Sequence, residues 1–264
     1  TAPCIAYATY KLQKKNPNAT VVVAPSDHLI LDEEVFLNTV QAALNHAQGN
    51  DELLTLGIKP TRPETGYGYI QVNPAKTKQV EGNKVFSVKT FTEKPDKELA
   101  KVFLQSGEFL WNSGIFIWNI RTIAQELEKY LPDIANQFKD IVPFYYTEKE
   151  EELIKGIYEG CNGISIDYGV MEKTNCSWVF ETSFGWSDVG TWGSLWTLLP
   201  HDQDGNAVVG ENIHLNECKR CIVHAPGASS VVLQGLEDCI VVERGGRMLI
   251  CHLSEEQRIK DFRK

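Results

Sequence analysis

The sequence contains no apolar run near the roughly 20 residues that span a bilayer. Its opening residues, Thr1-Ala2-Pro3-Cys4, show no basic segment followed by an apolar one, so no signal peptide is expected. Low-complexity segments are also absent. With 42% hydrophobic residues among 264, these absences predict a globular, cytoplasmic protein with no membrane partner.

Positive charge is also scarce, and the formal net charge is -9. An acidic protein is a poor candidate for non-specific binding to nucleic acid, so no nucleic-acid partner is predicted. Such a chain can still bind phosphorylated substrates if a divalent metal supplies the positive charge.

The familiar motifs of nucleophilic and zinc catalysis are missing. There is no Gly-x-Ser-x-Gly, no His-Glu-x-x-His and no Walker A sequence. The seven scattered cysteines are typical of free thiols in a reducing compartment. Cys218-x-x-Cys221 lacks a second clean pair, which argues against a zinc site. Asp202-x-Asp204 lacks the later ligands of a calcium loop and predicts a turn.

The apolar pattern that is present predicts an α/β fold. A helix should run from an N-cap at Thr1 to Asn16-Pro17. Val21 to Ala24 is a β-branched run of the kind found in strands buried on both faces. A helix from Glu33 to His46 and a second buried strand from Leu53 to Gly57 follow. This order is a βαβ unit, which favours parallel strands.

The middle of the chain mixes strands and helices, and its end changes character. Strands are predicted at 69–72, 84–91, 115–118 and 177–181, and helices at 96–105, 122–130, 148–158 and 191–199. From Gly205 onward, short β-type runs alternate with Gly, Asn and Glu, which predicts a small all-β module resembling a β-helix. A helix from Ser254 to Phe262, with Ser254 and Gln257 as a capping box, should close it. We therefore predict domains at 1–200 and 201–264.

Polar residues follow several of the predicted strands. Asp27 comes just after the first buried strand, where open α/β sheets place their ligands, and its carboxylate suits Mg²⁺. It could equally cap the next helix or form an Asx-turn. The two glycines of Gly66-Tyr67-Gly68-Tyr69, on either side of an aromatic residue, allow close approach of backbone to a ligand, or mark an ordinary turn.

Further turns of the same kind follow. Glu93-Lys94 ends a strand and could hold a ligand or be solvated surface. Asn112, between a Trp and a Ser-Gly pair, leads into an apolar strand and could bind sugar hydroxyls or sit in a turn. Asp167 lies in a strand-to-helix turn, and Asp188 is exposed in another. Each signal is weak alone, but several such turns in one domain indicate a ligand site.

Taken in order, these turns resemble the sugar-1-phosphate nucleotidylyltransferase family, in its mannose-1-phosphate guanylyltransferase branch. The matching stretches cover nearly the whole chain, and Pro25-Ser26-Asp27-His28 separates the mannose/GTP branch from glucose-type relatives. The matching stretches are 18–28, 62–70, 91–95, 111–116, 165–173 and 185–192, together with the opening Thr1-Ala2-Pro3. The resemblance implies a Rossmann-like nucleotidyltransferase domain with a mixed sheet and a β-helix-like C-terminal module. It also implies transfer of a guanylyl group from GTP to mannose 1-phosphate.

The resemblance also implies roles for individual residues. Asp27 and Asp188 would be the two Mg²⁺ ligands. Lys94 and Lys173 would lie near the phosphate or the sugar, with Lys94 among the catalytic residues. The sugar-binding residues would be Glu93 and Asn112 with Gly66 and Tyr67 beside them, and Asp167 would be structural or sugar-facing.

One element of the family's pattern is not matched. The family opens with a strand and a Gly-rich loop that grip the nucleotide, and the sequence here begins without Met at a helix N-terminus. We therefore expect the chain to be the greater part of a longer enzyme, which is expected to be a homo-oligomer such as a dimer. Alternatives are another sugar-1-phosphate nucleotidylyltransferase and a catalytically inactive regulatory relative. The Asp-x-Asp of a metal-dependent glycosyltransferase occurs only at Asp202-x-Asp204.

Overall fold

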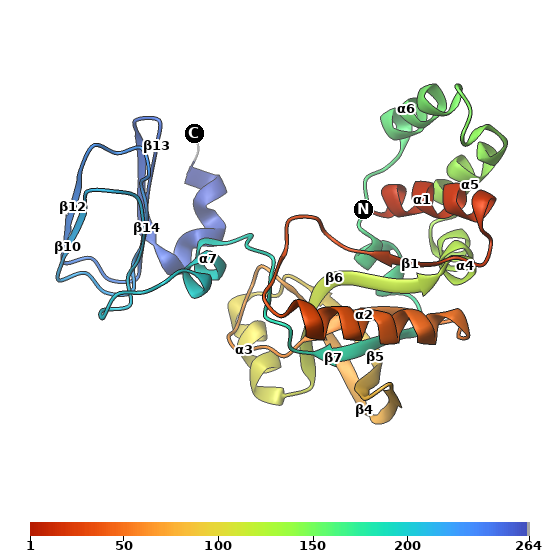
Figure 1. Ribbon diagram of the computed structural model, residues 1–264, viewed down its shortest axis with the longest axis horizontal. Helices are drawn as coiled ribbons and strands as arrows, with labels where there is room; N and C mark the ends of the chain where they lie inside the picture. The colour runs from red at the N-terminus through yellow and green to blue at the C-terminus, as the bar shows by residue number, and fades with distance from the viewer. Residues whose placement is uncertain (263–264) are drawn as a thin grey trace. The chain divides into compact units, whose positions relative to one another are not determined.

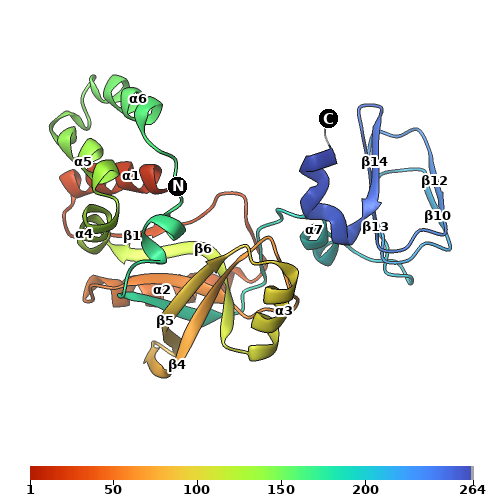
Figure 2. The ribbon, with the colours of Figure 1, turned by 180° about the vertical axis from the view of Figure 1, so that it is seen from behind.

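The structure is a computed structural model that describes residues 1–262 (Figures 1 and 2). Its contacts divide the chain into two compact units. The N-terminal unit comprises Thr1–Ser26 and Ile30–Trp186, and the C-terminal unit comprises Asp27–Leu29 and the residues from Ser187 onward. No helix within residues 1–262 is long and apolar enough to cross a membrane.

The N-terminal unit is built on a six-stranded mixed sheet in the order β1-β6-β3-β7-β5-β4. β1 and β3 both run antiparallel to β6, so they are parallel to each other, as the βαβ pattern predicts, but β6 lies between them. β3 and β7 pair in parallel, and β5 is antiparallel to β7 and to β4. The strands are β1 (Thr20–Val23), β3 (Leu53–Ile58), β4 (Gly68–Val80), β5 (Asn83–Glu93), β6 (Phe109–Asn119) and β7 (Ser177–Thr182).

Helices cover both faces of this sheet, as Figures 1 and 2 show. Alternate residues of a strand point to opposite faces. Accordingly, Leu53 and Trp118 pack with α1, α4 and α5, whereas Leu54 and Ile117 pack with α2 on the other face. The helices are α1 (Ala2–Lys15), α2 (Glu33–Gln48), α3 (Lys97–Ser106), α4 (Ile120–Tyr130), α5 (Pro132–Asp140) and α6 (Glu150–Gly160), with a short 3₁₀ turn η1 (Val142–Phe144).

Local signals explain most of the helix boundaries. α2 begins after Asp32, whose carboxylate accepts from Val35 N at 3.0 Å, and α3 begins after Asp96, which accepts from Leu99 N at 2.9 Å. Each of these bonds satisfies one of the amide groups left unpaired in the first helical turn. α5 was not predicted, although Pro132 stands in its first turn, where proline is well tolerated.

The prediction that Val21 to Ala24 is buried on both faces is wrong. β1 is at the end of the sheet order, and within residues 1–262 it pairs only with β6. Val22 is 38% exposed. A β-branched run therefore identified a strand correctly, but burial depends on the neighbours that the sheet supplies. The prediction is correct for β3, which is buried along its full length.

The open edge of β1 leads to a first prediction, because an edge strand with exposed apolar side chains promotes association between chains. We expect residues 1–264 to self-associate as concentration rises, and Val22→Lys to weaken this association about tenfold or more. Sedimentation velocity over a concentration series measures it. Leu12→Lys, at a helix residue that is 39% exposed, is the control. If Val22→Lys and Leu12→Lys weakened self-association equally, this would contradict a role for the open edge of β1.

The C-terminal unit confirms the prediction of a strand-rich region after residue 200. β9, β11 and β13 stack in parallel and in register, and Ala207, Ile222 and Ile240 form one of their stacked rows. β10 and β12 form a second parallel pair, and β14 closes the stack antiparallel to β13. The strands are β9 (Ala207–Val209), β10 (Ile213–Asn216), β11 (Ile222–His224), β12 (Val231–Gln234), β13 (Cys239–Arg244) and β14 (Arg247–His252).

Two helical segments flank these strands, and both have end contacts of their own. α7 (Trp192–Leu198) begins after Thr191, whose hydroxyl accepts from Ser194 N at 3.0 Å. The terminal segment, predicted as a helix with a capping box, is a 3₁₀ helix, η3 (Leu253–Phe262). There the Ser254 hydroxyl pairs with His252 Nδ1 at 2.8 Å. Ser254 thus lies inside the 3₁₀ helix and contacts the preceding histidine, and it does not form the predicted capping box.

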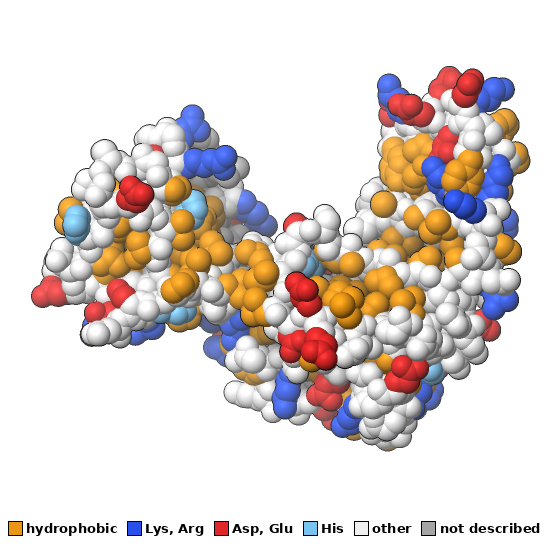
Figure 3. All heavy atoms as spheres, in the orientation of Figure 1, with side chains coloured by type: hydrophobic (Ala, Val, Ile, Leu, Met, Phe, Trp, Pro, Cys, Tyr) orange, Lys and Arg blue, Asp and Glu red, His pale blue; other side chains and the backbone are white. Residues whose placement is uncertain are grey.

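The motifs that we set aside in this unit have structural roles. Cys218 and Cys221 are buried in an apolar cluster. Asp202 accepts from the amides of Asp204 and Asn206 at 3.0 and 2.8 Å, which is the predicted turn. Apolar side chains also gather on the face of this unit seen in Figure 3. Val208, Val232, Met248 and Ile250 are exposed apolar residues of this unit.

Candidate functional site

Three of the predicted sugar-binding residues meet in the N-terminal unit. Asn112 lies within β6, not before an apolar strand as predicted, and its Nδ2 donates to Asp167 Oδ1 at 2.7 Å. Glu93 ends β5, and its carboxylate is close enough to Asp167 for the two charges to interact. Asp167 begins a π-helical turn, η2 (Asp167–Met171). Residues that are far apart in the sequence thus form one polar cluster.

Burial and mutual repulsion disfavour the charged form of these carboxyl groups. Burial raises the pKa of Glu93, and the Asp167 charge raises it further. Burial also raises the pKa of Asp167, against the opposing effect of the hydrogen bond from Asn112. The same two causes, burial and the Asp167 charge, raise the pKa of Glu172. Strong hydrogen-bond acceptors with raised pKa values, held close together, are typical of functional sites.

Gly68 provides the space for the Glu93 carboxylate. A Cβ atom at Gly68 would lie 2.5 Å from Glu93 Oε2 and 3.4 Å from Asn112 Cβ. Lys94, next along the chain, has φ of 47°, which non-glycine residues rarely adopt. Its ammonium lies 3.4 Å from Glu93 Oε1 and is largely exposed. Strained backbone of this kind persists only where the surrounding structure holds it in place, and it is often found at functional sites.

Gly66 and Tyr67 support this cluster through the backbone. Gly66 N donates to Glu64 Oε1 at 3.0 Å, which fixes the turn. The Tyr67 ring is buried in the core, edge-on to Trp111 with ring centroids 5.2 Å apart. Its carbonyl accepts from Lys94 N at 3.2 Å. The turn is therefore tied directly to the strained residue beside Glu93.

Lys173 is exposed just after the π-helical turn. Its charge lowers the pKa of Glu172, against the stronger effect of burial. The predicted strand before Asp167 is absent, because the segment from Ser165 enters the π-helical turn directly. In this turn the Glu172 amide donates to the Asp167 carbonyl at 2.9 Å. Lys173 therefore follows closely after the turn that Asp167 begins, and its role in binding stays a prediction.

The two predicted metal ligands, Asp27 and Asp188, both belong to the C-terminal unit. Asp27 is exposed and lies two residues before β2 (Leu29–Ile30), which pairs with β8 (Trp186–Ser187). Asp188 directly follows β8. Both carboxylates thus flank the same two-stranded ribbon.

The Asp188 turn is tightly organised. Asp188 Oδ1 accepts from Gly190 N at 2.9 Å, and a Cβ atom at Gly190 would lie 2.7 Å from Asp188 Oδ2. Between them, Val189 has φ of 52°, a marked outlier for a β-branched residue. Strained Lys94 directly follows Glu93, and strained Val189 directly follows Asp188, so each strained residue is next to a predicted site residue.

The chemistry of this pair fits a hard divalent cation. Carboxylate oxygens are the ligands that Mg²⁺ prefers, and it takes only one or two from a protein. Within residues 1–262, no group of three His, Cys, Asp or Glu side chains is placed to hold a metal ion. A cation whose shell is completed by phosphate and water does not need such a group.

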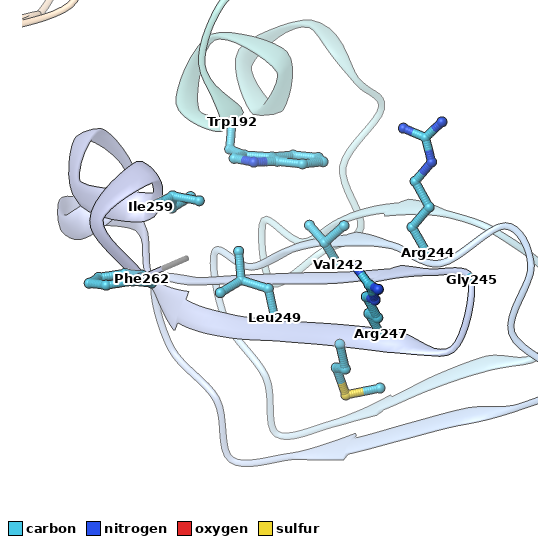
Figure 4. A pocket seen from close by; sticks show the side chains of 9 residues that line it. Trp192, Val242, Arg244, Gly245, Arg247, Leu249, Ile259 and Phe262 are labelled. Carbon is cyan, nitrogen blue, oxygen red and sulfur yellow. The ribbon is translucent and has the colours of Figure 1, made fainter. Parts of the chain in front are cut away.

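A hollow of about 1030 Å³ lies within the C-terminal unit. In Figure 4, Trp192 and Ile259 point toward Val242 and Leu249, with Arg244 at the hairpin end. Its lining is mainly apolar and includes none of the predicted site residues. We therefore place the candidate site by its polar chemistry and not by the volume of a hollow.

Sequence reasoning missed two residues of the polar cluster. Thr55 Oγ1 lies 3.3 Å from Asn112 Oδ1, and Glu172 lies near Asp167. A signal for Thr55 existed, because it is the only hydroxyl in the apolar run of β3. Glu172 gave no comparable signal.

The cluster leads to a prediction about stability and pH. The folded pKa of Asp167 is raised above its usual 3.8, so the folded state favours the protonated form. The contribution of protonated Asp167 to the free energy of unfolding is therefore fully present below pH 3.8. It is lost as the pH rises through the raised pKa of the folded state. Asp167→Asn keeps an acceptor for Asn112 but removes the charge. We expect a higher melting temperature than wild type at pH 7, and a difference that shrinks toward pH 4.

Calorimetry at several pH values measures this difference. The control is Asp204→Asn, because Asp204 is exposed in a surface turn. The electrostatic account would be contradicted if Asp204→Asn showed the same pH-dependent gain in melting temperature. It would also be contradicted if Asp167→Asn were less stable than wild type at pH 7.

Comparisons with known proteins identify the family of the chain. The family model described as nucleotidyl transferase matches residues 1–205. The chain is 34% identical to a mannose-1-phosphate guanylyltransferase of Escherichia coli, covering 99% of the chain and 56% of that protein. It is 38% identical to one of Salmonella montevideo, covering 98% of the chain and 54% of that protein. It is 36% identical to the alginate biosynthesis protein AlgA of Pseudomonas aeruginosa, covering 98% and 53%.

A solved structure is similar over the same extent. A mannose-1-phosphate geranyltransferase from Thermus thermophilus matches with a TM-score of 0.83 and 28% identity, covering 99% of this chain and 73% of that one. The chain spans about half the length of the curated relatives that it matches. The family match ends at residue 205 and the contact boundary lies after Trp186, so the domain boundary at 200 stays a prediction. With a matched family model over most of its length and a mixed α/β fold of the same kind, the chain belongs to the nucleotidyl transferase family.

Proposed function

We propose that the protein transfers a guanylyl group from GTP to mannose 1-phosphate, giving GDP-mannose and pyrophosphate. The observation that carries the proposal is the cluster of Glu93, Asn112 and Asp167 in the N-terminal unit. Carboxylates and an amide held together are suited to several hydroxyls of one sugar ring. The names of the similar proteins support the choice of mannose 1-phosphate and GTP.

The charge of the cluster orients the sugar phosphate. Carboxylates repel a phosphate group, so Glu93 and Asp167 should face the ring hydroxyls and the phosphate should lie away from them. Exposed Lys94 is the nearby cation that could meet the phosphate. Orientation of this kind holds the attacking oxygen in place, which is a large part of catalysis in phosphoryl transfer.

The reaction needs no protein nucleophile or base. A phosphate oxygen of the sugar phosphate attacks the α-phosphorus of GTP. The bond between the α-phosphorus and the oxygen that bridges it to the β-phosphorus breaks, and pyrophosphate leaves with that oxygen. The attacking oxygen is already anionic near neutral pH, which accounts for the missing Ser/His and Cys/His motifs. We propose that Asp27 and Asp188 hold Mg²⁺, which would neutralise charge on the reacting phosphates.

A coupled pyrophosphate-release assay on the full-length protein tests the proposal. GTP, ATP, UTP and dTTP are each combined with mannose 1-phosphate and glucose 1-phosphate, in the presence of Mg²⁺. We expect turnover to be fastest with GTP and mannose 1-phosphate. Preference for another pair would assign a different sugar nucleotidylyltransferase, and no turnover with any pair would favour an inactive relative.

A further inference from the structure

Thr55 occupies an unusual position in the core of the N-terminal unit. It lies in the middle of β3, whose other residues are apolar or glycine, and it is 0% exposed. A buried hydroxyl costs free energy unless it is hydrogen-bonded. Thr55 Oγ1 lies 3.1 Å from the Ile115 carbonyl and 3.3 Å from Asn112 Oδ1. Its single hydrogen is therefore shared between a backbone acceptor and a residue of the candidate site.

These contacts fix which way the Asn112 amide faces. Gly114 N donates to Asn112 Oδ1 at 3.2 Å, and the Thr55 hydroxyl approaches the same oxygen. Two donors on one side require the amide oxygen there, so the amide nitrogen faces the other way. That nitrogen donates to Asp167 Oδ1 at 2.7 Å. Thr55, Asn112 and Asp167 thus form a chain of contacts from the core to the polar cluster.

The local backbone supports the same arrangement. The pairing of β3 with β6 shifts register between Thr55 and Gly57, and Gly114 has φ of 71°. An irregularity of this kind re-aims a side chain out of the regular ladder. Here it places Asn112 between a core hydroxyl and a carboxylate, on the side where Gly68 leaves space for Glu93.

A carboxylate offers about four acceptor positions, so the bond from Asn112 leaves Asp167 able to accept from a ligand hydroxyl. We propose that Thr55 is a positioning residue for the sugar: its hydroxyl orients the Asn112 amide, which holds Asp167 to accept a hydrogen bond from a hydroxyl of the hexose ring. This inference rests on the proposed function, because it takes a sugar phosphate as the ligand.

Thr55→Val tests the inference, since valine has nearly the shape of threonine and lacks the hydroxyl. In the full-length protein, we expect the KM for mannose 1-phosphate to rise about tenfold, as for the loss of one hydrogen bond. The KM for GTP should change less than about twofold, because the positioning acts only on the sugar. Thr55→Ser restores the hydroxyl and should return the KM toward wild type.

Thr39→Val is the matched control. Thr39 is a buried threonine on α2, 3% exposed, whose hydroxyl donates to the Val35 carbonyl at 2.8 Å. The same chemical change there should leave both KM values unchanged. Thr55→Cys, with a weakly donating thiol, is measured in parallel, so that poor folding of the valine variant does not decide the result.

A double-mutant cycle with Asp167→Asn tests the proposed connection. If Thr55 acts through Asp167, its substitution should have a smaller effect on the KM for mannose 1-phosphate when Asp167 is already replaced. The inference would be overturned by an unchanged KM for mannose 1-phosphate in folded Thr55→Val and Thr55→Cys, by equal rises of the KM for both substrates, or by full additivity with Asp167→Asn. In these cases wild-type activity still supports the proposed function. A wild-type protein with no turnover overturns both.

Discussion

Asp188→Ala should lower kcat about a thousandfold or more while leaving the protein folded. Under the proposed function, Asp188 is one of two carboxylates that hold the cation, and loss of such a ligand removes several kcal/mol of transition-state stabilisation. The cost in stability should be small. The substitution removes one hydrogen bond, from Gly190 N at 2.9 Å, in a half-exposed turn.

Asp188→Asn sharpens this experiment. The asparagine oxygen can still accept from Gly190 N, so the turn is kept while the negative charge is lost. Turnover is measured by pyrophosphate release over a range of Mg²⁺ concentrations, and folding by thermal denaturation. Asp204→Ala, at an exposed turn aspartate, should behave as wild type. Near-wild-type turnover of either Asp188 variant at saturating Mg²⁺ would remove this residue from the proposed metal site.

Gly68→Ala should lower kcat/KM for mannose 1-phosphate about a hundredfold. The new Cβ would lie 2.5 Å from Glu93 Oε2, so the carboxylate must move by about an ångström, and misplacement on this scale can cost about that factor. The KM for GTP should be unchanged. The fold should tolerate the alanine, because the displaced atom is the end of a flexible side chain and Gly68 is not at a positive φ.

Gly156→Ala is the control for this substitution. Gly156 lies in α6, and a Cβ atom added there would meet no other atom within 4 Å. Alanine there should raise helix stability by about 0.5–1 kcal/mol and leave both kinetic constants alone. Steady-state kinetics with each substrate varied in turn make the comparison. An unchanged KM for mannose 1-phosphate in Gly68→Ala would show that the position of Glu93 does not matter for the sugar.

Local patterns in the sequence were sufficient for much of the fold. Helix starts at Asp32 and Asp96 follow from side chains that bond to amides three residues on, a contact made within one turn. β3 was identified as a buried strand because its apolar run has no polar face. The short runs after residue 200 predicted a strand-rich module for the same reason. All of these signals act over a few residues.

The ligand site stays a prediction, and the structure brings together only some of the residues predicted for it. Residues Glu93, Asn112 and Asp167 were selected as separate turns on a resemblance, and the contact between Asn112 and Asp167 spans 55 positions in the sequence. No local pattern contains such a contact. Thr55 and Gly68 matter in the structure only because other strands bring Asn112 and Glu93 against them.

The sequence by itself determined where most of the strands and helices form, because caps, prolines and apolar periodicity act within a few residues. Only the tertiary structure decided which strand lies at the edge of the sheet and which polar side chains come together in one cluster. β1 has the same apolar character as β3, yet Val22 is exposed because β6 covers only one of its edges. Burial and hydrogen bonding depend on neighbours that are distant in sequence, and only the folded sheet supplies them.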